Sequence, residues 1–252
     1  KRTVYSNEPT ETGFTNSLIR VTTEAMGLVC FSDGHLESNP FSLQDHDHSE
    51  EHGYSFHNHS SGGRPKTIHE RHGMGMARNS LEILGYQIEQ RILVQEVDTL
   101  DECSIFVVAS PQIKFHPMEI RQIEHYLSKG GRVLMLLEPE VNSGLETLLS
   151  TYGIGVGGGR VKDFDRHYWT DPSTPAVTNY PRHRVTRELP LTFFPGVSEL
   201  KSVEITDGLR IDTTVLIATS TRASAGNDEK TLRSRPIAVM SKELASDAVL
   251  IV

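Results

Sequence analysis

The chain has 252 residues, a length that fits one large domain or a domain with a smaller appendage. It carries 25 basic residues against 33 acidic ones, which gives a formal net charge of -8. Because an acidic chain without a run of Lys and Arg repels phosphate backbones, these numbers argue against nucleic-acid binding.

Predicted helices and strands alternate in the first part of the chain. Apolar residues at helical spacing predict a helix within 13–26, and the run LVCFSD predicts a buried strand at 28–33. Further on, the pattern predicts a helix at 75–84, a strand at 86–94, a strand at 103–111, a helix at 116–129, a strand at 132–140 and a helix at 143–153. Strands that are apolar on both faces and alternate with helices predict a parallel sheet covered on both sides.

The pattern changes from about residue 157. A weakly periodic segment rich in Gly, Pro and Thr is followed by five runs typical of strands, LTFFPGV, KSVEI, TTVLIATS, PIAVMSK and AVLIV. The segment TRASAGNDEKTLRSR predicts a polar exposed loop. We therefore expect an α/β sheet domain over 1–156 and a β-rich continuation of it, or a closely packed subdomain, over 157–252.

A histidine-rich insertion is expected at about 38–73, between the first buried strand and the next helix. Seven of the chain's 12 histidines fall within residues 45–73. The triplets HDH and HNH place His46 and His48, and His57 and His59, two residues apart, so these four could bind zinc, copper or nickel. The alternatives are a solvated insertion without a dedicated ion and a contact surface that charges below about pH 6.5.

The predicted strand ends carry a second group of polar residues. In an open parallel sheet, ligands bind outside the carboxyl ends of the strands. A cleft there could bind a cation, an amine or a sugar hydroxyl, unless these side chains only cap helices or lie in solvent. The candidate ligand-binding residues are Asp33, His35, Glu37, Ser110, Glu138 and Glu140.

No catalytic residue is predicted. An amidotransferase-like hydrolase needs a nucleophile on a tight strand-to-helix turn with small flanking residues, and neither G-x-C-x-G nor G-x-S-x-G occurs in the chain. Ser110 stays an alternative nucleophile, but Pro111 after it lacks the N–H of an oxyanion donor. Cys30 and Cys103 lie in or beside apolar runs and are expected to be small buried residues, so they indicate no compartment.

The order of these segments resembles the extracytoplasmic auxiliary domain of ABC-type transport systems, in the family that contains the gliding-motility protein G. The segments that carry the resemblance are VCFSDGHLES, LEILGYQIEQ, VVASPQIKFHPMEIRQIEHYLSKGGRVLMLLEPE, LLSTYGIGV, PLTFFPGV and VLIATSTRAS. They span almost the whole chain. The histidine-rich insertion and Leu36, which stands where the family usually has Gly, depart from the pattern.

This resemblance implies a three-layer α/β sandwich with a mainly parallel sheet, like that of class I amidotransferases, flavodoxin-like proteins and the intraflagellar-transport domain. It also implies a non-enzymatic accessory domain on the periplasmic side, partnered by an ABC permease and ATPase and capable of homo- or hetero-oligomer formation. No stretch of about 18 apolar residues occurs, so we expect any membrane anchor in segments outside this chain. The resemblance brings no cofactor. A periplasmic protein that binds zinc through the histidines, or a hydrolase, are the alternatives.

Overall fold

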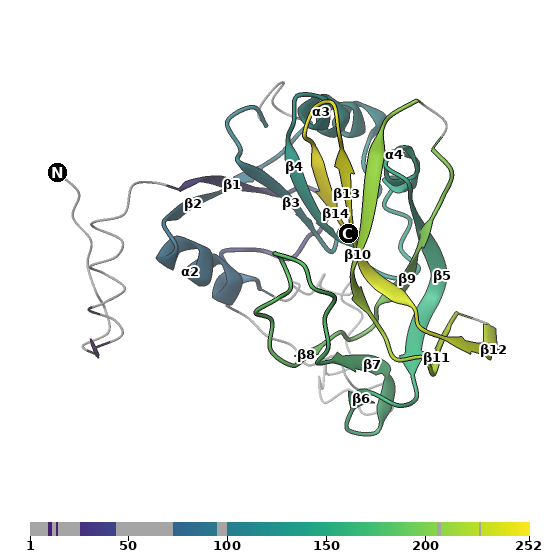
Figure 1. The fold of residues 1–252 in the computed structure, drawn as a ribbon. Coiled ribbons are helices and arrows are strands. Elements are labelled where there is room, and N and C mark those ends of the chain that lie inside the picture. The colour runs from purple at the N-terminus through teal and green to yellow at the C-terminus, as the bar shows by residue number, and fades with distance from the viewer. Residues whose placement is uncertain are drawn as a thin grey trace, which may run out of the picture. The chain divides into compact units, whose positions relative to one another are not determined.

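The computed structural model describes residues 10, 11, 14, 26–43, 73–94, 100–205, 208–226 and 228–252 (Figure 1). The chain divides into two compact units, Lys1–Met26 with Ser38–Ile88, and Gly27–Glu37 with Glu89–Val252. In the described ranges, no helix is both long and apolar enough to cross a bilayer.

Helix α2 (Gly75–Ile83) is the main described element of the first unit. The amide of Gly75 donates to the carbonyl of Ser42 at 2.9 Å, and the guanidinium of Arg78 lies 5.2 Å from the centre of the Phe41 ring. A Cβ atom on Gly73 would collide with the Ser42 backbone, so a glycine is needed where the two segments meet.

A mixed seven-stranded sheet is the centre of the second unit. Its strands are, in spatial order, β10 (Ile211–Ala218), β13 (Pro236–Glu243), β14 (Val249–Ile251), β4 (Arg132–Leu136), β3 (Ile105–Ala109), β1 (Gly27–Ser32) and β2 (Tyr86–Arg91). Strands β14, β4, β3 and β1 pair in parallel, whereas β10 with β13 and β13 with β14 are antiparallel. The last of the seven, β2, crosses the boundary between the two units.

The predicted three-layer sandwich with a mainly parallel sheet is wrong. Besides the mixed sheet, the described residues form one antiparallel sheet in the order β12 (Asp228–Arg233), β11 (Ala223–Ala225), β5 (Ile154–Asp163) and β9 (Ser198–Ser202). Another contains β6 (His167–Tyr168), β7 (Asp171–Val177) and β8 (Thr192–Phe193). The physical reason is that β13 of the C-terminal part pairs antiparallel with both β10 and β14, whereas β14 joins the sheet in parallel beside β4.

Most individual elements of the predicted α/β part are confirmed. The buried strands β1, β3 and β4 and the helices α2, α3 (Pro117–Ser128) and α4 (Glu146–Thr151) lie where the periodicity places them. Side chains from α3 and α4, among them Ile123, Leu127 and Leu148, are fully buried in one cluster with Phe106 of β3. Burial of this kind stabilises by roughly 25 cal/mol per Å² of apolar surface, so the cluster fixes both helices on the sheet.

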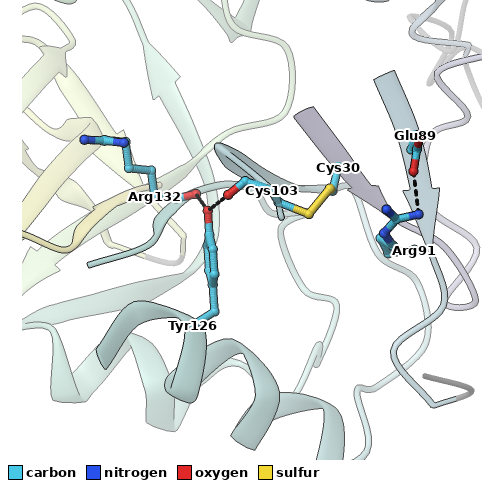
Figure 2. Close-up of a disulfide and its surroundings, with 6 residues drawn as sticks. All are labelled: Cys30, Glu89, Arg91, Cys103, Tyr126 and Arg132. Atoms are coloured by element: carbon cyan, nitrogen blue, oxygen red, sulfur yellow. Dashed lines mark hydrogen bonds and ion pairs between the residues drawn. A yellow bond between two sulfur atoms is a disulfide. The ribbon is translucent and has the colours of Figure 1, made fainter. Parts of the chain in front are cut away.

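A disulfide joins Cys30 in β1 to Cys103 just before β3, with a Cα–Cα distance of 5.8 Å (Figure 2). Both cysteines are buried, as predicted, but they are also bonded to each other, which that prediction did not include. Tyr126 of α3 donates its hydroxyl to the carbonyl of Cys103 at 2.8 Å. The disulfide therefore connects two neighbouring parallel strands at a point that helix α3 also contacts.

Candidate functional site

The turn after β1 presents His35 at the carboxyl end of the strand. The amide of His35 donates to Glu37 Oε2 at 2.6 Å, and its carbonyl accepts from the amides of Gln112, at 2.8 Å, and Ile113, at 3.2 Å. These bonds hold the turn after β1 against the segment after β3. Leu36 has a φ of +57°, the left-handed region that glycine adopts without strain, which explains the Gly that the resemblance expects there.

Two carboxylates flank the imidazole of His35. Nε2 lies 3.0 Å from Glu119 Oε2, and Nδ1 lies 3.3 Å from Glu37 Oε1. The ring stacks on Phe115 with 3.9 Å between the ring centres. His35 is 7% exposed and Glu119 2%, so this group of charges is almost completely removed from water.

Helix α3 positions Glu119, a residue that the sequence reasoning missed. His116 caps the helix, Pro117 is its first residue, and the Glu119 carboxylate accepts the amide of His116 at 2.8 Å, completing a capping box. The signal was present in the sequence, because an acidic residue two positions after a helix-starting Pro is placed to turn back toward the cap. What the sequence did not give is that the same carboxylate also reaches His35.

The pKa of His35 is raised and the pKa of Glu37 is lowered by the contacts within this group. Burial alone lowers the pKa of His35, but its hydrogen bond with Glu37 and the negative charges of Glu119 and Glu37 together raise it above 6.5. Burial raises the pKa of Glu37, but hydrogen bonds from the His35 side chain and backbone bring it below 4.5. The imidazolium form is therefore favoured between the two carboxylates.

We expect the stability difference between the wild type and His35→Gln to depend on pH. A group whose pKa is raised by folding stabilises fully below its unfolded pKa, about 6.5, and loses this effect as the pH rises through the folded pKa. Urea unfolding of both proteins from pH 6 to pH 9 should show the difference shrinking with increasing pH. A difference that grows with pH would contradict the assignment of a charged His35.

The other predicted ligand-binding residues lie at the ends of the same strands. The carboxylate of Asp33 accepts the amide of the next residue, Gly34, at 2.8 Å. Ser110 follows β3, and its amide donates to the carbonyl of Leu136 at 2.7 Å. Glu138 and Glu140 follow β4, the first half-buried and the second exposed. The structure thus joins His35 and Glu37 directly, and ligand binding by the set of six stays a prediction.

The geometry of this site favours a fixed positive charge on His35 over proton transfer by it. Both ring nitrogens of His35 face carboxylates, so neither is directed at a hydroxyl that could serve as a nucleophile. Ser110 has a φ of +54°, a strained value also found at nucleophile turns, but helix α3 does not begin until Pro117. A tight strand-to-helix turn is therefore not formed at Ser110.

The predicted metal ligands His46, His48, His57 and His59 lie outside the described residues, so their role in zinc binding stays a prediction. In the part of the chain that is described, no group of three or more His, Cys, Asp or Glu side chains is arranged to hold a metal ion. Three surface hollows, of about 970, 450 and 340 Å³, are lined by other residues than the six at the strand ends. The hollow of about 970 Å³ lies within the loop 178–189.

Comparison with known proteins places these features in context. Residues 73–248, more than half of the chain, match the family described as "ABC-type uncharacterized transport system". No curated protein matches the chain. The N-terminal domain of mmIFT52 superposes with a TM-score of 0.61 at 15% identity, over 89% of this chain and 84% of that one. The cytoplasmic protein STM3548 from Salmonella typhimurium gives a TM-score of 0.51 at 15% identity, over 90% of this chain and 86% of that one. At these identities the similarity concerns the fold alone, and it agrees with the expected likeness to an intraflagellar-transport domain.

Proposed function

Because the chain belongs to the family of ABC-type uncharacterized transport systems, as an auxiliary domain, we propose that it works outside the cytoplasm as a non-enzymatic accessory module of gliding-motility type. In this proposal it contacts an ABC permease, whose ATPase is a separate chain. Anchoring segments outside the 252 residues hold it at the periplasmic face of the membrane. The bound state is a hetero-oligomer with the permease.

The disulfide between Cys30 and Cys103 supports the extracytoplasmic location. Disulfides form and persist in oxidising compartments, whereas cytosolic reductants keep most thiols reduced. The pair is buried in the main cluster of the second unit, so it has the character of a structural bond and not of an exposed redox switch.

The buried charges around His35 carry the non-enzymatic part of the proposal. An imidazolium held by Glu37 and Glu119 orders the turn after β1 and the start of α3, and it supplies no base to a nucleophile. The ordered turn after β1 presents Asp33, and the segment after β4 presents Glu138 and Glu140, as polar contacts toward a partner or a small ligand. A thermal-shift assay with cations, amines and sugars tests the small-ligand alternative. A compound that raises the melting temperature of the wild type but not that of Glu138→Gln would be identified as a ligand of this site.

Co-purification tests the partner directly. We expect the full-length protein, with its anchoring segments, to co-elute from detergent with the permease encoded beside it, because an auxiliary domain functions in the assembled transporter. The control is the double variant Cys30→Ala with Cys103→Ala. The fraction of it that co-elutes with the permease should fall only as far as its folded fraction, measured by circular dichroism, falls. Elution of the folded protein alone, with the permease elsewhere, would overturn the proposal.

A further inference from the structure

The chain's single tryptophan, Trp169, is 86% exposed. It occupies the turn between β6 and β7 with a φ of +49°. The left-handed region costs a residue with a side chain about 1 kcal/mol or more, and hairpin turns of this kind favour Gly, Asn or Asp. Trp169 therefore neither packs in the protein nor eases the turn, which is typical of a residue that contacts something else.

Further exposed apolar side chains continue from this turn. The ring of Tyr168 meets that of Phe193 edge to face with 4.9 Å between the ring centres, although the two belong to different strands. Leu191 lies two residues before Phe193 and is 51% exposed. We name Tyr168, Trp169, Leu191 and Phe193 the aromatic strip. In Figure 1 the strands that carry it lie at the end of their unit opposite α3.

A basic loop adjoins the aromatic strip. The loop 178–190 connects β7 to β8 and is closed at its base by the Tyr180 hydroxyl, which donates to the carbonyl of Pro190 at 2.9 Å. Arg182, Arg184 and Arg187 are exposed on it. The loop 178–190 holds these three arginines and one acid, Glu188, which lies 3.2 Å from Arg187, and Asp171 stands opposite Tyr168 at the base of the β6–β7 turn, although the whole chain has a net charge of -8. Positive charge is thus concentrated next to the apolar strip.

We propose that the aromatic strip and the basic loop bind the surface of a bilayer that contains anionic phospholipids. Tryptophan and tyrosine favour the headgroup level of a membrane, where the ring is apolar and the polar edge stays hydrated. Arginine binds phosphate oxygens through two parallel hydrogen bonds. Trp169 and Tyr168 enter the interface, and the three arginines contact the lipid phosphates.

The shape of the hairpin favours lipid over a protein partner. Protein hot spots are commonly aromatic side chains that fill a matching pocket within a well-packed interface. The indole at the tip of this two-residue turn is 86% exposed, and a fluid interface accepts it without a preformed pocket. This proposal goes beyond the accessory function and does not depend on it, since lipid binding requires no permease.

The single tryptophan makes the test direct, because the tryptophan emission of the wild type, excited selectively over its seven tyrosines, reports on position 169 alone. The 252-residue protein is titrated with vesicles of pure phosphatidylcholine and with vesicles of equimolar phosphatidylcholine and phosphatidylglycerol. We expect the emission to shift to shorter wavelength with the anionic vesicles only, and the shift to weaken at high salt. Sedimentation with the anionic vesicles should be lost in Trp169→Ala.

Two triple variants separate specific from general charge effects, and both keep the reporter. Arg182→Gln, Arg184→Gln and Arg187→Gln together should weaken the partition coefficient about 100-fold, roughly fivefold for each arginine. The control removes the same charge from exposed positions elsewhere, with Arg121→Gln, Lys201→Gln and Lys230→Gln, and should bind like the wild type.

Three results would overturn the proposal. The first is an unchanged emission with anionic vesicles. The second is equal weakening in both triple variants, which would show only the overall charge. The third is a tryptophan emission that shifts when permease is added but not when vesicles are added, which would make the strip a protein interface.

Discussion

Replacement of Cys30 and Cys103 together by Ala is expected to lower the free energy of unfolding by about 4 kcal/mol. The two residues are separated by 73 positions, and closing a loop of this length restricts the unfolded chain by an amount of that order. For a chain of this size the midpoint of thermal unfolding should fall by about 10 °C. Thermal melts of the wild type with and without a phosphine reductant measure the same effect without mutation.

The double variant is the control for the reductant. Since it has no disulfide, its melting temperature should be the same with and without reductant, and equal to that of the reduced wild type. A wild type whose melting temperature does not respond to reductant, although alkylation shows that both thiols became free, would contradict a stabilising bond between β1 and β3.

The second large effect is expected at Glu199, in β9. Its carboxylate pairs with Arg233 and lies 3.0 Å from the guanidinium of Arg235, which donates further to the carbonyls of Ala223 and Thr231. Glu199 is 2% exposed and Arg235 3%, so removing one leaves the other charge buried without its main partner. Glu199→Ala should therefore cost about 3–5 kcal/mol in the free energy of unfolding by urea.

A compensated variant makes this prediction specific to charge. Replacing both members, Glu199→Leu with Arg235→Met, leaves no buried charge and should cost less than Glu199→Ala alone. The loss of unfolding free energy in the double variant could instead equal the sum of the losses in Glu199→Leu and in Arg235→Met. That result would mean that packing volume and not charge pairing decides the stability there.

Much of the fold was predictable from apolar runs, because a run such as IFVVA can only be a buried strand in a chain of this kind. The direction of pairing was not, since the apolar run of β13 resembles those of the parallel strands and nothing in its composition shows that it pairs antiparallel with β10 and β14. This is why the sheet is mixed where a mainly parallel one was predicted.

Two strand regions were missed for local reasons. Strand β5 contains the run GVGGGR, which shows no alternation of apolar residues. Gly157 and Gly159 are needed because β9 and the turn at Gly226 approach closely: a Cβ atom on Gly157 would lie 2.9 Å from the carbonyl of Glu199, and one on Gly159 would lie 2.7 Å from the Cα atom of Gly226. Strands β11 and β12 form a polar hairpin that composition alone presents as an exposed loop.

The candidate site was predicted in part. Its position at the strand ends and two of its members, His35 and Glu37, follow from the order of strands and polar turns. Glu119 comes from a helix far along the sequence, and a contact of that kind depends on how α3 docks on the sheet. The same holds for the disulfide, because a Cα–Cα distance within bonding reach is a property of the folded chain.

The most direct test of an auxiliary role is the ATP hydrolysis rate of the permease and its ATPase in proteoliposomes, measured with increasing amounts of the full-length protein. The account predicts a change in rate that saturates as the protein occupies the permease, while the protein alone hydrolyses no ATP. A rate that stays constant at every ratio, with both partners shown to be folded and inserted, would contradict it.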